Sequence, residues 1–149
     1  MSLNLCFKPF WTNIVAISAL TLSAVAAPAS ASEPGVTVTI MDIETPEGFM
    51  MIALFDEAGW GNEAIEAVRL PVSGDSFSTI LVLPAPGKYG IRVFHDVDGN
   101  GELNSNMIGL PTEPFGFSNN APPRFGPPSF ADAAFDVDEN GATQIISLK

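Results

Sequence analysis

Five side chains with oxygen ligands alternate along one short stretch of the chain, in the order typical of a calcium-binding loop. The stretch reads H-D-V-D-G-N-G-E-L-N and spans residues 95–104. The five residues are Asp96, Asp98, Asn100, Glu102 and Asn104. They take loop positions 1, 3, 5, 7 and 9, with the usual glycine at position 6, and position 7 contributes its backbone carbonyl. Such a loop turns alternate oxygens towards one centre, and calcium accepts about six to eight of them.

The residue that normally closes such a loop is missing. Met107 stands at position 12, where a calcium loop carries a bidentate Glu. A remote carboxylate such as Glu113 would have to complete the shell. The alternative interpretation is a turn in which Asp and Asn side chains bond their own backbone, and the missing Glu favours it. No helix pattern flanks the stretch, so a loop of a β-protein must position these residues.

One histidine and one serine suggest a second, enzymatic hypothesis. His95 is the only histidine of the chain, and Ser118 in G-F-S partly matches a nucleophile elbow. Asn120 replaces the second glycine of that motif. A lone histidine beside Asp96 at a strand end is more often structural. We therefore expect no enzymatic activity, and the alternative is a small secreted hydrolase that uses His95 and Ser118.

A loop rich in phenylalanine and proline is a third candidate surface. It reads F-G-F-S-N-N-A-P-P-R-F-G-P-P-S-F over residues 115–130, whereas loops are normally polar. The candidate binding residues are Phe115, Phe117, Asn119, Asn120, Arg124 and Phe125. Their partner would be a protein, peptide, glycan or hydrophobic ligand. The favoured alternative is that the rings plug the open end of the fold, because large aromatic side chains are usually buried. Trp60 has the same two interpretations.

Short strands separated by turns must position these groups. Strands are predicted at residues 36–40, 49–55, 67–72, 77–83, 88–95, 134–137 and 143–148. Hairpin-type turns are predicted at 73–75 and 138–141, and short helices at 62–66 and after Ser129. About seven strands and little helix indicate an all-β fold. We predict a single antiparallel β-sandwich, immunoglobulin-like or transthyretin-like, with one long loop rich in Gly, Pro and Asn over residues 96–129.

The first 31 residues are predicted to be a secretory signal peptide. Lys8 precedes an apolar run over residues 14–27, and Pro28 and A-S-A follow it. An uncleaved membrane anchor is the competing interpretation, but the apolar run has only about 14 residues where a span needs about 20. Cleavage after Ala31 would leave one domain, residues 32–149, in the periplasm or outside the cell.

Cleavage would leave a strongly acidic domain without cysteine. Five basic residues then stand against 17 acidic ones, so the net charge is 5 − 17 = −12. Phosphate backbones and anionic lipids repel such a surface, so we expect no nucleic-acid partner and no membrane partner after cleavage. The single cysteine, Cys6, lies in the removed segment, and the domain therefore needs no disulfide or thiol chemistry.

Three longer motifs resemble a known bacterial family. They read L-P-x-P-G-K-Y-G-I-R-V-F-H-D-V-D-G-N-G-E-L-N, G-L-P-T-E-P-F-G-F-S-N-N-A and G-P-P-S-F-A-D-A-A-F. Residues 36–149 closely resemble the secreted family catalogued as domain of unknown function 2141. The resemblance implies an exported β-sandwich similar to transthyretin-like or carboxypeptidase-regulatory-like modules, with an accessory or binding role. This chain has Asn104 where the family commonly has Asp, which weakens a metal site by one charge.

These observations predict an exported, non-enzymatic binding or structural module. Its expected working surface is the region 95–130. If calcium binds, its expected role is to fix that loop region.

Overall fold

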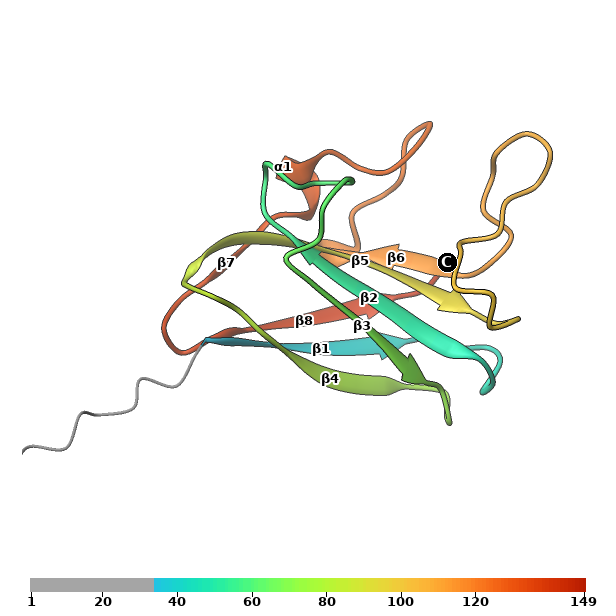
Figure 1. Ribbon diagram of the computed structural model, residues 1–149, viewed down its shortest axis with the longest axis horizontal. Helices are drawn as coiled ribbons and strands as arrows, with labels where there is room; N and C mark the ends of the chain where they lie inside the picture. Colours follow the sequence, from blue (N-terminus) through green and yellow to red (C-terminus); the bar gives the residue numbers. More distant parts are fainter. Residues whose placement is uncertain (1–33) are drawn as a thin grey trace, which may run out of the picture. The chain divides into compact units, whose positions relative to one another are not determined.

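Two stacked β-sheets make up the structure, a computed structural model that describes residues 34–149 (Figure 1). One sheet has three strands in the order β4–β1–β8, and the other has the order β3–β2–β5–β6 with β7 also paired to β5. The bounds are β1 Gly35–Met41, β2 Phe49–Phe55, β3 Glu66–Pro71, β4 Phe77–Val82, β5 Gly87–Asp96, β6 Phe115–Phe117, β7 Phe135–Val137 and β8 Ala142–Ser147. The predicted all-β sandwich is confirmed.

The strand pairings and the two core clusters of the described residues lie in one compact unit, Ala31–Lys149. Residues 32–149, the chain expected after cleavage, contain all of these elements. The predicted signal peptide, residues 1–31, lies outside the described residues. Among the described helices, none combines the length and the apolar character that crossing a bilayer requires.

The hydrophobic core lies between the two sheets, where the strand period places it. In β1, Val36, Val38 and Ile40 are fully buried, while Thr37 and Thr39 between them are half-buried. Successive strand residues face opposite sides, so this alternation gives each strand one core face. Each fully buried side chain of this size stabilises the fold by about 1.5–3 kcal/mol.

Neither predicted hairpin continues into a pair of neighbouring strands, because its turn carries the chain from one sheet to the other. At residues 138–141 only Asp138 and Gly141 pair, in an isolated antiparallel bridge. β3 pairs with β2 while β4 pairs with β1, and β7 pairs with β5 while β8 pairs with β1. The turn residues themselves behave as expected, since Gly141 has a φ of 89° and donates to the Asp138 carbonyl. A turn reverses the chain but does not choose its next partner. The pair β1–β8 is also parallel, so the sandwich is not wholly antiparallel.

The helix predicted at residues 62–66 is absent from the described structure. The amide of Asn62 donates to the Gly59 carbonyl in a turn, and Glu66 already belongs to β3. So short a segment cannot offset the cost of starting a helix without tertiary support.

The helix predicted after Ser129 is confirmed as α1, Phe130–Ala133. The Ser129 side chain accepts a hydrogen bond from the Asp132 amide, which is one half of a capping box. In place of the other half, the Ser129 hydroxyl donates to the Asp132 carboxylate. The predicted long loop also contains two short elements, strand β6 and the 3-10 helix η1, Ser118–Asn120.

The outer face of the five-stranded sheet is only partly covered. In β2 the outward-facing Phe49, Met51 and Ala53 are half-buried and only Phe55 is buried, although the continuous apolar run predicts cover on both faces. The loops at 56–65, 97–114 and 121–129 rise over this face (Figure 1). Between them a second, smaller core forms from Phe117, Ala121 and Ala133, with Trp60 and Phe115 packed against it.

Candidate functional site

Asp96 is the last residue of strand β5, at the end of the sheet where the long loop begins. His95 pairs with the core residue Met50, so Asp96 faces the outer side of the sheet, and both His95 and Asp96 are fully buried. Asp96 Oδ2 accepts hydrogen bonds from the Gly101 amide at 3.0 Å and from Arg69 Nη2 at 3.5 Å. Its other oxygen, Oδ1, is buried and has no hydrogen-bond partner among the described residues.

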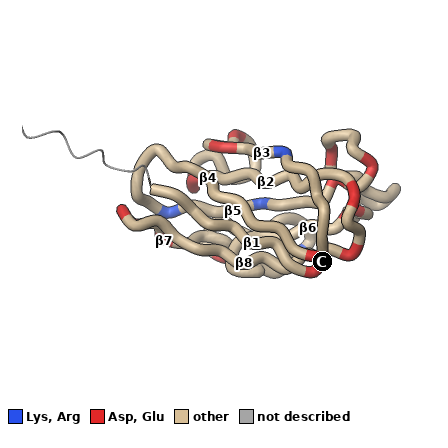
Figure 2. Tube along the Cα trace, turned by 90° about the horizontal axis from the view of Figure 1, so that it is seen from below, with Lys and Arg blue, Asp and Glu red and all other residues tan. Residues whose placement is uncertain are grey.

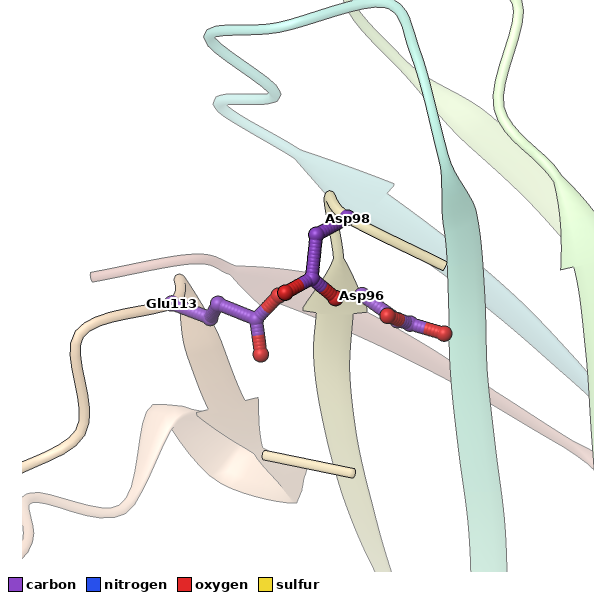
Figure 3. Close-up of side chains that lie close together, drawn as sticks. All are labelled: Asp96, Asp98 and Glu113. Atoms are coloured by element: carbon purple, nitrogen blue, oxygen red, sulfur yellow. The ribbon is translucent and has the colours of Figure 1, made fainter. Parts of the chain in front are cut away.

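Glu113 brings a carboxylate next to the loop whose position 12 lacks one. One of its oxygens accepts from the Val97 amide and the other from the Asn104 amide, both at 2.9 Å. Oxygens of Asp96, Asp98 and Glu113 lie within 4.8 Å of one another. Figure 3 shows these three side chains close together. Oxygens bound to one calcium ion at about 2.3–2.6 Å lie at most about 5 Å apart, so this spacing fits a single ion.

A turn within the long loop returns Glu113 to the start of that loop. The Asn106 amide donates to the Leu110 carbonyl, and Ser105 pairs with Pro111 in an isolated β-bridge. The Asn106 side chain accepts from the Leu110 amide at 3.0 Å and so closes the same turn. This local fold lets a residue nine positions after Asn104 approach Asp96.

The asparagines form a polar network around Asp98. Asn100 and Asn104 each donate from Nδ2 to Asp98 Oδ2, at 3.1 and 2.8 Å. Asn100 Oδ1 accepts from the Glu102 amide at 2.7 Å, and the Glu102 side chain is exposed. These are the local bonds of the turn interpretation, and they coexist with the carboxylate cluster. Rotation of the Asn104 side-chain amide by half a turn would direct its oxygen, in place of its nitrogen, towards the carboxylate cluster.

The net charge of the cluster and its neighbour Arg69 matches a divalent cation. Three carboxylates and the guanidinium of Arg69 sum to −3 + 1 = −2. Figure 2 shows acidic residues in the loops at the end of the sandwich that carries the C-terminus. A divalent ion would neutralise this local charge.

Asp96 is ionised at neutral pH although it is buried. Burial acts to raise its pKa, but hydrogen bonds from the Gly101 amide and from Arg69, together with the Gly99 amide and the Arg69 charge, hold the pKa below its ordinary value. The carboxylate is therefore available as a ligand without losing a proton first.

The lowered pKa predicts that Asp96 stabilises the fold above about pH 4 and loses that effect in acid. A depressed carboxyl pKa gives stability that is present above the unfolded-state pKa of about 3.9 and is lost as pH falls through the folded-state pKa. Urea unfolding of the wild type and of Asp96→Asn, in chelator from pH 7 to pH 2, measures this. We expect the difference in the free energy of unfolding between the two proteins to stay constant down to about pH 4 and to shrink below that pH. A difference that shrinks between pH 7 and pH 5 would contradict the assignment.

His95 and Ser118 are not brought together as a catalytic pair. Ser118 is fully buried, and its Oγ accepts from the Ile91 amide at 2.9 Å and donates to the Ala133 carbonyl at 2.5 Å. His95 Nε2 bonds the Glu47 carbonyl at 2.6 Å instead. Ile91 and His95 lie four residues apart on β5, which is about 13 Å along a strand. Both side chains thus have structural partners.

The predicted binding residues divide into two groups. Phe115, Phe117 and Phe125 line hollows on the outer side of the sheet. Asn119 and Asn120 instead fasten the loop, since Asn119 donates to the Ala134 carbonyl and the Asn120 side chain bonds backbone groups of β8. Arg124 is exposed and forms no salt bridge within the described residues.

Comparison with known proteins identifies the family. The model of the family described as "Uncharacterized protein conserved in bacteria (DUF2141)" matches residues 38–146. The protein belongs to the DUF2141 family. The matched range of this DUF2141 domain contains the three carboxylates, β6 and the Phe-rich loop. Neither the curated proteins nor the solved structures contain a match.

Two arginines on the outer face of the DUF2141 domain were not expected from the sequence. Arg69 bonds Asp96 and the Gly99 carbonyl, and its guanidinium lies 3.4 Å from the centre of the Phe49 ring. Arg92 lies 4.4 Å from the centre of the Trp60 ring. The signal for Arg92 was its place inside the apolar strand sequence I-R-V-F, where a charge needs a reason.

Proposed function

We propose that this DUF2141 protein is an exported, non-enzymatic binding module whose working surface, residues 95–130, is held in shape by one calcium ion. The observation that supports the calcium site best is the approach of Asp96, Asp98 and Glu113 to within 4.8 Å. Glu113 comes from outside the sequence pattern of the loop, and it supplies the carboxylate whose absence argued against a metal. The buried, unpartnered Oδ1 of Asp96 is a second supporting observation.

A bound ion would connect the two ends of the long loop. Asp96 is the last residue of β5, and Glu113 lies two residues before β6. Crosslinking these points lowers the freedom of residues 97–112, which carry several exposed apolar side chains. A surface fixed in this way loses less entropy when it binds a partner.

Export and a binding role have separate support. The N-terminal 31 residues have the composition of a cleaved leader, and the acidic domain contains no cysteine after that point. The outer face of the five-stranded sheet is partly uncovered and apolar, which is typical of a surface that meets a ligand.

Hydrogen exchange tests whether calcium holds this surface. Calcium is expected to slow the exchange of the amides in residues 97–104 by about tenfold or more, because Glu113 and Asp96 hold the amides of Val97, Gly101 and Asn104. Glu113→Gln should keep the fold and lose this calcium-dependent protection.

Glu139→Gln is the matched control, since Glu139 is an exposed acid in the turn between β7 and β8. It should leave the calcium effect unchanged. Equal exchange of residues 97–104 with calcium and with chelator would overturn the proposal.

A further inference from the structure

The outer face of the five-stranded sheet contains a hollow, which is formed by residues that lie opposite one another on neighbouring strands. One row across the sheet runs Ala67, Ala53, Arg92 and Phe117, and the row beside it includes Met51 and Phe94. All six line a hollow of about 390 Å³. Two alanines stand together in a row whose other members are large, and their small side chains leave the floor open beside Arg92.

This hollow continues into a second one beneath the two long loops. Both hollows are lined by Leu103, Phe115, Phe117 and Pro127, and the second has a volume of about 630 Å³. We call the two together the outer groove. Ile108 and Phe125 form walls of the second hollow and are 79% and 114% exposed, so they are available to cover a ligand. Pockets for small ligands typically have volumes of about 300–1,000 Å³.

Arg92 is a cation in this apolar groove without a counter-ion. No acidic group of residues 34–149 lies within salt-bridge distance of it, and its buried Nε has no hydrogen-bond partner there. Its guanidinium lies 4.4 Å from the centre of the Trp60 ring and 5.3 Å from that of Phe55. Burial lowers the pKa of Arg92, as it does for a charge that nothing compensates.

The contacts of Arg92 with the Trp60 and Phe55 rings are cation–π contacts, which take up none of its terminal N–H groups as hydrogen-bond donors. The guanidinium carries these N–H donors in its own plane. Nη1 and Nη2 form no hydrogen bond with the described residues, and neither is completely buried. The planar edge of Arg92 stays open because its neighbour Gly61 has no side chain, since a Cβ there would lie 2.6 Å from Nη2 and 3.2 Å from Nη1. A carboxylate at this edge can accept two parallel hydrogen bonds.

We infer that the outer groove binds a small amphipathic carboxylate of the fatty-acid class. Its carboxylate meets the edge of Arg92, and its apolar chain lies along Ala53 and Phe117 towards Phe125. The two alanines provide space for the ligand. The unpaired charge of Arg92 in an apolar groove favours a ligand with a carboxylate at one end and an apolar chain. The inference rests on the proposed function in taking residues 95–130 as part of the binding surface, and it extends that surface to Arg92 and Ala53 on the sheet beneath.

Dodecanoate binding to residues 32–149 tests the inference. Trp60 is the only tryptophan of this part of the chain and lies beside Arg92, so its emission reports on the groove, and calorimetry measures the affinity. The uncharged analogue 1-dodecanol has the same chain. We expect dodecanoate to bind roughly ten- to hundredfold more tightly than 1-dodecanol, as hydrogen bonds to a charged group predict.

Three variants separate the parts of the site. Arg92→Gln should reduce the affinity for dodecanoate to that for 1-dodecanol, whereas Lys88→Gln removes the same charge at the exposed ion pair with Asp136 and should have no effect. Ala53→Leu fills the floor of the hollow and should weaken the binding of both ligands at least tenfold. Melting temperatures of all variants show that they are folded.

Equal affinities for dodecanoate and 1-dodecanol, or no effect of Arg92→Gln, would overturn carboxylate recognition. Absence of binding by both ligands would overturn the ligand class. An amidated apolar peptide that binds where dodecanoate does not would assign the groove to a protein partner and also overturn the inference. Calcium stabilisation measured on the same samples tests the proposed function separately, because Arg92 lies outside the carboxylate cluster.

Discussion

Replacing Ser118 by Ala is expected to lower the free energy of unfolding by about 2–6 kcal/mol. Ser118 is fully buried, and its hydroxyl connects the Ile91 amide of β5 to the Ala133 carbonyl at the end of α1. The substitution leaves both backbone groups without this partner in a buried place, and each such group costs about 1–3 kcal/mol. Urea unfolding followed by the emission of Trp60 measures the loss.

Ser73→Ala is the control for this prediction. Ser73 is exposed, and its side chain makes no hydrogen bond among the described residues, so the change should stay within about 0.5 kcal/mol. A catalytic Ser118 would give the opposite pattern, with stability kept and an activity lost. A Ser118→Ala protein as stable as the wild type would show that the buried bonds do not stabilise the fold.

Calcium is expected to raise the melting temperature of the domain by about 10 °C at a concentration one hundred times its Kd. Binding to the folded state alone contributes about 2.7 kcal/mol under that condition. Sites of extracellular modules have Kd values of about 0.1–1 mM, so about 10 mM calcium suffices at the tighter end of that range. Thermal unfolding in calcium and in chelator measures the shift.

Asp98→Ala should abolish the calcium-dependent shift, because Asp98 is the exposed carboxylate between Asp96 and Glu113. Asp75→Ala, which removes an exposed acid in the turn between β3 and β4, should leave the shift unchanged. Magnesium should produce a smaller rise, since it requires shorter bonds and stricter octahedral geometry. Similar shifts in Asp98→Ala and the wild type would place the calcium effect elsewhere.

Several elements could be predicted from local chemistry. Gly48 precedes the apolar run at 49–55 and Asp56 follows it, and β2 has the same bounds in the structure. In β1 the alternation of apolar and polar residues gives the observed alternation of burial. The spacing of Ser129 and Asp132 likewise predicted the start of α1. In each case neighbours in the sequence determine the outcome.

The choice of strand partners could not be predicted in the same way. Residues 73–75 and 138–141 predict reversals of the chain, but each reversal crosses from one sheet to the other. Which sheet a strand joins depends on the fit of its apolar face to the whole core. The parallel pair β1–β8 connects residues about a hundred positions apart, which no local pattern encodes.

The candidate metal site combines local and distant contributions. Asp96 and Asp98 follow from the alternation in the loop, and Glu113 could be named from the sequence only as a remote candidate. Its approach depends on the turn closed by Asn106 and on the place of β6 beside β5. The unpaired Arg92 depends on its neighbours across the sheet, and those become known only with the register.

Isothermal titration of calcium into chelator-treated residues 32–149 measures occupancy of the carboxylate cluster itself. We expect one calcium ion per chain, and we expect Asp98→Ala and Glu113→Gln each to weaken binding at least tenfold, whereas Glu139→Gln binds like the wild type. No heat of binding up to about 10 mM calcium, well above the Kd range of about 0.1–1 mM for such modules, would contradict this expectation. Equal binding by the wild type and Glu113→Gln would contradict the closing role of Glu113.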